Sequence, residues 1–176
     1  MFAKQGNSGN KVNIKRLTLY ALLTAVCLII GYLESLLSIT LIAVAPGVKL
    51  GLSNAVVLTL ICTNDTKGAY LVNVIRICLS ALLFGSPISF VLSLSGGITA
   101  TFIAHILSRS KSVSAIGISI ASAVTHNVFQ LVAAVFIVGF GVLYYLPVLI
   151  LLGAVCGAFC GILAQLVLKH SKNFKV

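Results

Sequence analysis

Long apolar runs separated by short polar breaks set the pattern of this chain. The runs cover residues 17–33, 50–63, 69–84, 88–107, 113–138 and 142–168. Between them lie residues that favour turns and loops, for example the stretch Asn64-Asp65-Thr66-Lys67-Gly68. Apolar runs of this kind fold as helices in lipid, because a helix satisfies its own backbone hydrogen bonds. The pattern predicts six helices, with the second and third unusually short and Pro147 interrupting the sixth near its start.

The connection between the first two helices has a pattern of its own. Residues 35–45 are apolar but too few to cross a bilayer, which predicts a loop or half-helix at the membrane surface. They lead into Pro46-Gly47-Val48-Lys49-Leu50-Gly51-Leu52-Ser53-Asn54, where proline and glycine allow a sharp turn. Two interpretations remain open. Lys49 and Asn54 either face a substrate, or form a turn whose lysine extends to the membrane interface.

Composition places the chain in the membrane. At 60% hydrophobic and 8% charged residues, with a mean hydropathy of +1.18, it has too little polar surface for a water-soluble domain. We expect a multi-pass protein of the cytoplasmic membrane, with one transmembrane domain at 17–169 and cytoplasmic tails at 1–16 and 170–176. The cysteines lie inside apolar runs, which favours buried thiols over a metal site or disulfides.

The net charge of +10 indicates topology rather than a nucleic-acid partner, because the cations gather in short loops and tails. A cytoplasmic amino terminus places ten of the 12 basic residues on the inside: Lys4, Lys11, Lys15, Arg16, Lys67, Arg109, Lys111, Lys169, Lys172 and Lys175. Outside lies Lys49, and Arg76 lies within a helix. The sequence therefore predicts six spans with both termini in the cytoplasm.

Polar residues inside the predicted helices form the candidate site. Arg76 and His126 lie near mid-membrane, where an arginine costs roughly 2.5 to 3.5 kcal/mol. The acids are Glu34 and Asp65, and Asp65 lies on the cytoplasmic side, so a ligand with a phosphate or carboxylate is one source of the missing negative charge. The alternative is an Arg76 that only locks the bundle. The candidate substrate-binding residues are Glu34, Lys49, Asn54, Asn73, Arg76, Ser93, Ser95, His126, Asn127 and Gln130.

Four segments in this order carry a family resemblance: residues 46–54, Arg76 with Leu83-Phe84-Gly85-Ser86, Ser93-Leu94-Ser95-Gly96-Gly97, and His126-Asn127 with Gln130. Together they resemble the Gx transporter family, often labelled heptaprenyl diphosphate synthase component I. That family is similar to the substrate-binding S components of energy-coupling factor (ECF) vitamin transporters. The resemblance implies a six-helix fold that captures a small molecule from outside.

The same resemblance assigns a docking role to Ala21 and Ala25. They form a small-x-x-x-small pair that lets another helix approach closely. In S components such a pair meets the transmembrane coupling subunit, which works with ATPase subunits. A second stripe, Gly153, Gly157 and Gly161, is predicted to pack the sixth helix within its own bundle.

Enzymatic activity is not expected. Magnesium-diphosphate chemistry needs clustered carboxylates, whereas this chain has 2 acids, and it lacks a phosphate-binding loop for ATP. We therefore expect no catalytic residues, metal or cofactor. Two functions stay open: a substrate-capture subunit of a transporter, and a non-catalytic membrane subunit of an isoprenoid, quinone or flavin-linked assembly.

Overall fold

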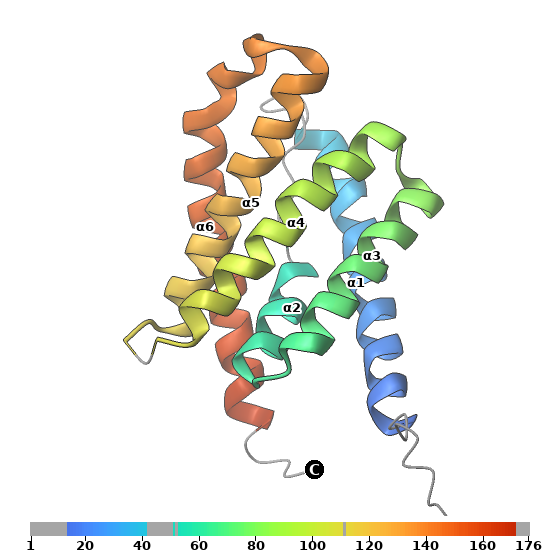
Figure 1. Ribbon diagram of the computed structural model, residues 1–176, viewed down its shortest axis with the longest axis vertical. Coiled ribbons are helices and arrows are strands. Elements are labelled where there is room, and N and C mark those ends of the chain that lie inside the picture. The colour runs from blue at the N-terminus through green and yellow to red at the C-terminus, as the bar shows by residue number, and fades with distance from the viewer. Residues whose placement is uncertain (1–13, 42–50, 52, 111, 172–176) are drawn as a thin grey trace, which may run out of the picture.

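The chain folds as a bundle of helices (Figure 1). The computed structural model describes residues 14–41, 51, 53–110 and 112–171. Its elements are α1 (Ile14–Leu41), α2 (Ser53–Cys62), α3 (Thr66–Phe84), α4 (Pro87–Ser108), α5 (Ala115–Val138), the 3-10 helix η1 (Phe140–Tyr145) and α6 (Leu146–Ser171). The six predicted helices are confirmed. The predicted break near Pro147 is also present, as the change from η1 to α6.

Local sequence explains where several helices begin and end. Asp65, Ser86 and Ser114 each precede a helix, and their side chains accept a hydrogen bond from the backbone N–H three residues later. Pro87 opens α4, a position where its missing N–H costs nothing. Gly139 ends α5 with φ of 106°, a conformation that favours glycine.

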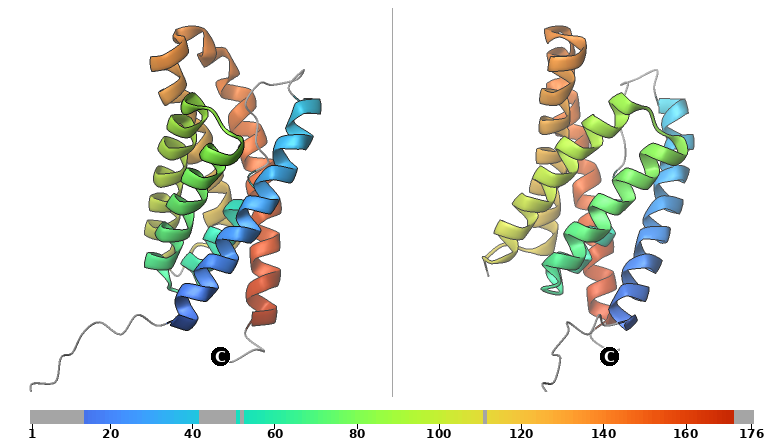
Figure 2. Two further views of the ribbon diagram at one scale, coloured as in Figure 1. Left: turned by 90° about the vertical axis from the view of Figure 1, so that its right-hand side faces the viewer. Right: turned by 45° about the vertical axis from the view of Figure 1, so that its right-hand side comes forward.

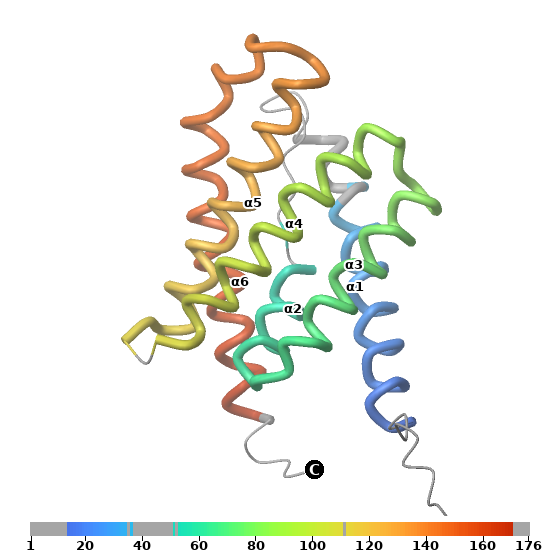
Figure 3. Tube along the Cα trace, in the orientation of Figure 1, coloured from blue at the N-terminus to red at the C-terminus, as the bar shows by residue number. Residues whose placement is uncertain are grey.

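Successive helices run in opposite directions (Figure 3). The short helix α2 lies between α1 and α6 and contacts both, as well as α3, α4 and α5. Its Val57, Leu58 and Ile61 are buried and form the centre of the core with Ala69 and Val72 of α3. The α5–α6 hairpin extends beyond the α3–α4 hairpin at the end that carries η1 (Figure 2).

The second helix is the shortest of the six α-helices. Five helical segments of the described chain are long and apolar enough to cross a bilayer, and α2, with 10 residues, is not among them. Ten residues rise about 15 Å, roughly half the thickness of the hydrocarbon core. α2 alone therefore rises through about half of that thickness, and five of its ten residues are buried inside the protein.

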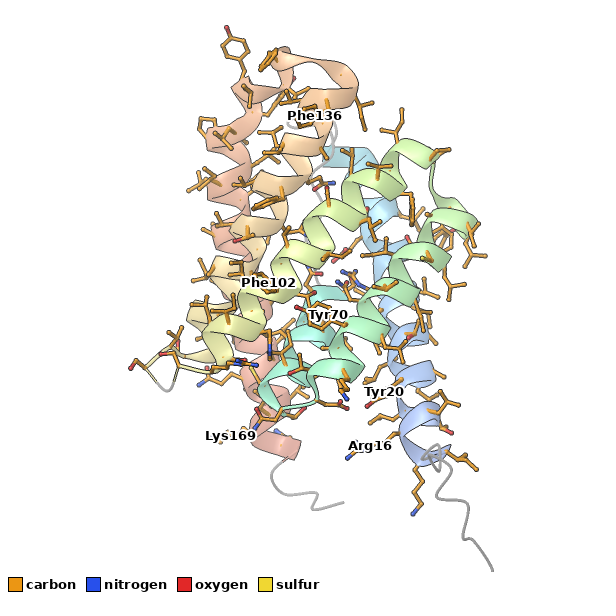
Figure 4. The ribbon with its side chains drawn as sticks, in the orientation of Figure 1. Arg16, Tyr20, Tyr70, Phe102, Phe136 and Lys169 are labelled. Atoms are coloured by element: carbon orange, nitrogen blue, oxygen red, sulfur yellow. The ribbon has the colours of Figure 1, made fainter. Side chains whose placement is uncertain are left out.

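The first helix is longer than predicted. Residues 35–41, expected to be part of a surface loop or half-helix, continue α1 without a break. Most of the turn that begins at Pro46, including Lys49, lies outside the described residues. Arg16 at the start of α1 and Lys169 near the end of α6 lie at the same end of the bundle, and Phe136 lies at the other (Figure 4).

The glycine stripe of α6 packs within the bundle, as predicted. A Cβ added at Gly157 would lie 2.8 Å from the Cα of Ile120, and one at Gly161 would lie 2.7 Å from the Cα of Ile116. Both neighbours belong to α5, so the glycines let the two helix backbones approach closely. The outer surface of the bundle is covered by exposed apolar side chains such as Leu22 and Phe102, as expected for contact with lipid.

Candidate functional site

Arg76 joins α3 to the first turn of α2. Its Nη1 donates to Ser53 Oγ at 2.5 Å and its Nη2 donates to Asn54 Oδ1 at 2.6 Å. Its Nε donates to Asn73 Oδ1, one turn earlier on α3, at 2.9 Å. These partners are neutral, so they satisfy the guanidinium's hydrogen bonds without supplying a negative charge.

Asn73 extends this network to α4. Its Nδ2 donates to the carbonyl oxygen of Gly97 at 2.9 Å and to Thr101 Oγ1 at 2.8 Å. Asn73 and Thr101 are both buried, and Gly97 leaves space for the approach of α3, because a Cβ there would lie 2.6 Å from Ile77 Cδ1. A polar network thus runs through the bundle from α2 to α3 and α4.

A cavity of about 60 Å³ lies beside Arg76. Its polar lining comes from five helices: Glu34 (α1), Ser53 and Asn54 (α2), Arg76 and Ser80 (α3), Ser93 (α4) and His126 (α5). Glu34 is buried, with 3% of its surface exposed. The structure therefore brings together five of the predicted site residues, namely Glu34, Asn54, Arg76, Ser93 and His126.

A second cavity of about 40 Å³ adjoins the first through shared lining residues, Gly51, Asn54 and His126. Asn127, also predicted, lines it, and its Nδ2 donates to the carbonyl oxygen of Leu149 on α6 at 2.8 Å. Gly153 and Gly157 of α6 form part of the opposite wall. The close packing of α5 on α6 therefore sets the width of this cavity.

The remaining predicted residues lie elsewhere. Asn73 lines neither cavity and acts on the site through its bond to Arg76. Ser95 Oγ donates to the carbonyl oxygens of Leu92 and Phe129, so it contacts backbone in α4 and α5. Gln130 is half-buried and lines neither cavity. Lys49 lies outside the described residues, and Ala21 and Ala25 are exposed on α1.

Two further polar side chains of the cavity were not among the predicted site residues. Ser53 is buried and accepts a hydrogen bond from Arg76, and Ser80 lines the larger cavity one turn after Arg76. Ser80 could have been found from its i, i+4 spacing with Arg76. Ser53 gave a weaker signal, because a serine at the first position of a helix is also a common cap.

The cavity is small and combines one cationic side chain, Arg76, and one carboxyl side chain, Glu34, with neutral polar groups. A cavity needs about 10 to 15 Å³ for each water, so 60 Å³ holds about four waters or one small charged group. Among the described residues, no group of three or more His, Cys, Asp or Glu side chains could hold a metal ion. Arg76 offers planar hydrogen-bond donors that suit carboxylate and phosphate, and His126 and Asn54 add polar groups.

The sequence matches a known protein family. No curated protein and no solved structure matches the sequence. The family model described as heptaprenyl diphosphate synthase component I matches residues 23–167, which include every helix from the middle of α1 to near the end of α6. This multi-helix membrane protein therefore belongs to the heptaprenyl diphosphate synthase component I family.

Proposed function

We propose that this protein is a substrate-binding membrane subunit for the uptake of a small anionic, vitamin- or cofactor-like molecule. It would act like an S component of an ECF transporter, with partner ATPase subunits supplying the energy. The observation that carries the proposal is the polar cavity beside Arg76, built by side chains from five helices inside an apolar bundle. Polar groups inside a membrane protein are costly, and they commonly mark substrate pathways.

The charge of Arg76 points to the class of ligand. Its described hydrogen bonds go to Asn73, Ser53 and Asn54, which carry no charge. Glu34 is the one carboxylate that lines the cavity among the described residues. A ligand carboxylate or phosphate in the cavity would gain charge-assisted hydrogen bonds from the guanidinium, in a surrounding of low dielectric constant.

We propose a binding role and no catalysis. The other acid of the chain, Asp65, is engaged at the start of α3, where it accepts from Tyr20 Oη at 2.6 Å and from the Gly68 N–H at 3.2 Å. A magnesium-diphosphate site needs several oxygen ligands, and the cavity offers the single carboxylate of Glu34. Energy would come from partner chains, docked on the exposed face of α1 at Ala21 and Ala25.

The family description favours a second candidate function. A component I of a heptaprenyl diphosphate synthase would be a membrane subunit of an isoprenoid-forming assembly. In that case Arg76 would be structural, and its bonds between α2 and α3 would be its whole role. The two candidates differ in whether a small anion occupies the cavity.

Native mass spectrometry of protein extracted in mild detergent tests the proposal. We expect wild-type protein to carry a small anion that is released on unfolding, together with ATPase subunits in gentle preparations. Arg76→Gln should lose the anion, because the charge is removed. Arg109→Gln is the matched control, since Arg109 is exposed at the end of α4. Wild-type protein that is reproducibly empty but bound to a soluble prenyltransferase would favour the second candidate instead.

A further inference from the structure

A large apolar groove lies on the side of the bundle formed by α1, α2 and α6. Its volume is about 610 Å³, roughly ten times that of the polar cavity. Its lining includes Leu23 and Ile30 of α1, Val56 and Thr59 of α2, and Phe159 and Leu163 of α6. Thr59 is the one polar side chain among all the lining residues, and its Oγ donates to the carbonyl oxygen of Ala55 in its own helix at 2.8 Å.

The groove exists because α2 is short. In the described part of the chain α1 and α6 each contact α2 but do not contact one another. The ten-residue α2 fills the space between them over only part of their length. What remains is a gap in the wall of the bundle, open toward the lipid. Phe159, at one edge of the gap, is 55% exposed.

One end of the groove is positively charged. Arg16, Leu23 and Ile30 are spaced seven residues apart, which places them on one face of α1. Arg16 is therefore about 10 Å from Leu23 along the helix, toward the start of α1. On α6, His170 lies seven residues after the groove residue Leu163, which places it on the same face. Figure 4 shows Arg16 and Lys169 at the same end of the bundle.

Negative charge at this end is already engaged. Asp65, the one acid described there, accepts hydrogen bonds from Tyr20 and from the Gly68 backbone. The first turn of α1 carries no acid, and the last turn of α6 carries Lys169 and His170. The end of the groove therefore combines the exposed basic side chains Arg16 and His170 with an apolar surface that continues along the bundle.

We infer that this groove binds an anionic phospholipid, with an acyl chain between α1 and α6 and the phosphate headgroup at Arg16. Basic pockets between membrane helices bind anionic headgroups, and each Lys or Arg near the surface contributes about 1 kcal/mol to such attraction. The site is separate from the proposed docking face, because Ala21 and Ala25 are each two residues from Leu23 and point to the opposite side of α1. It is also independent of the proposed transport function.

The chain has no tryptophan, which permits a direct test. Phe159→Trp places a sole tryptophan in the groove, and Phe129→Trp places one on the lipid-facing side of α5, where Phe129 is 45% exposed. At 1.5 Å per residue, Phe159 is about 18 Å from the end of α6, and Phe129 is about 21 Å from the start of α5. Both helix ends lie toward the same end of the bundle, so the two tryptophans have similar depths. The full-length variants are reconstituted in vesicles that contain phosphatidylglycerol or phosphatidylcholine with brominated acyl chains, which quench tryptophan fluorescence on contact.

For each tryptophan, the lipid preference is the ratio of quenching by brominated phosphatidylglycerol to quenching by brominated phosphatidylcholine. This ratio should be about fivefold higher for the groove tryptophan than for the control tryptophan. In the Phe159→Trp background, Arg16→Gln should remove most of this preference, and Arg109→Gln, which changes an arginine on α4, should leave it intact. Equal preference at both tryptophans, or a preference that survives Arg16→Gln, would overturn the inference. So would a groove tryptophan that neither lipid quenches, because the groove would then be covered by protein.

Discussion

At the scale of single residues, Arg76 connects the polar network to α2. Its hydrogen bonds to Ser53 and Asn54 tie α3 to the start of α2. Hydrogen bonds between membrane helices contribute on average about 0.6 kcal/mol and up to about 1.7 kcal/mol each. We therefore predict that Arg76→Gln lowers the free energy of unfolding by roughly 1 to 3 kcal/mol, measured by reversible unfolding in mixed micelles.

Arg109→Gln is again the control for this change. Arg109 is exposed just after α4, and the described hydrogen bond of its side chain joins Nη2 to Nε2 of His105, one turn earlier, at 3.1 Å. Its substitution should alter stability by less than about 0.5 kcal/mol. If both variants were as stable as the wild type, the bonds from Arg76 to α2 would contribute nothing measurable to the fold.

At the scale of elements, the contact between α5 and α6 depends on glycine. A Cβ at Gly157 would lie 2.8 Å from the Cα of Ile120 and 3.0 Å from the carbonyl oxygen of Ser119. Backbone atoms cannot move aside as a flexible side chain can, so Gly157→Ala should force the helices apart and cost about 1 to 3 kcal/mol. Thermal unfolding in detergent measures this cost.

The matched control is Gly141→Ala. Gly141 lies in η1, and a Cβ added there has no atom within 4 Å. This substitution should leave the unfolding temperature nearly unchanged. Equal unfolding temperatures for the two variants would mean that α6 adjusts to the added methyl group, and that the close approach at Gly157 is not required.

The exposed face of α1 gives a second prediction at this scale. Replacing Ala21 and Ala25 by leucine adds bulk where the structure has no packed neighbour to displace, since both residues are exposed. We expect unchanged unfolding temperature and unchanged anion content, but loss of ATPase subunits from the purified complex. Leucine at the exposed position Val26 is the control. If the double variant kept its ATPase subunits, the alanine pair would not be the docking site.

At the scale of the whole molecule, the cations predict the orientation. The end that carries Arg16 and Lys169 should face the cytoplasm, because positive residues concentrate there (Figure 4). A reporter that fluoresces only in the cytoplasm should be bright after Val176. Inserted at Ser86, in the turn between α3 and α4 at the opposite end, it should be dark. The reverse pattern would place the polar cavity on the wrong face for uptake.

The sequence by itself determined the class of protein, the existence of the six α-helices and several residues that line the cavity beside Arg76. Apolar runs in lipid have few alternatives to helix, so their ends were predicted to within a few residues at α3, α4 and α5. Polar residues in such runs must face the interior. Arg76, His126, Glu34, Asn54 and Ser93 could therefore be predicted to meet in the bundle, and they line one cavity.

Only the tertiary structure decided how these groups are connected. The sequence shows that the second apolar run is short, but only its neighbours show where it lies: α2 begins at the buried Ser53 and is surrounded by the other five α-helices. The sequence could not show that Arg76 donates to Ser53, or that Ser95 contacts the backbone of α5, because neither spacing nor composition fixes which helices are adjacent. The groove between α1 and α6 follows from that same arrangement.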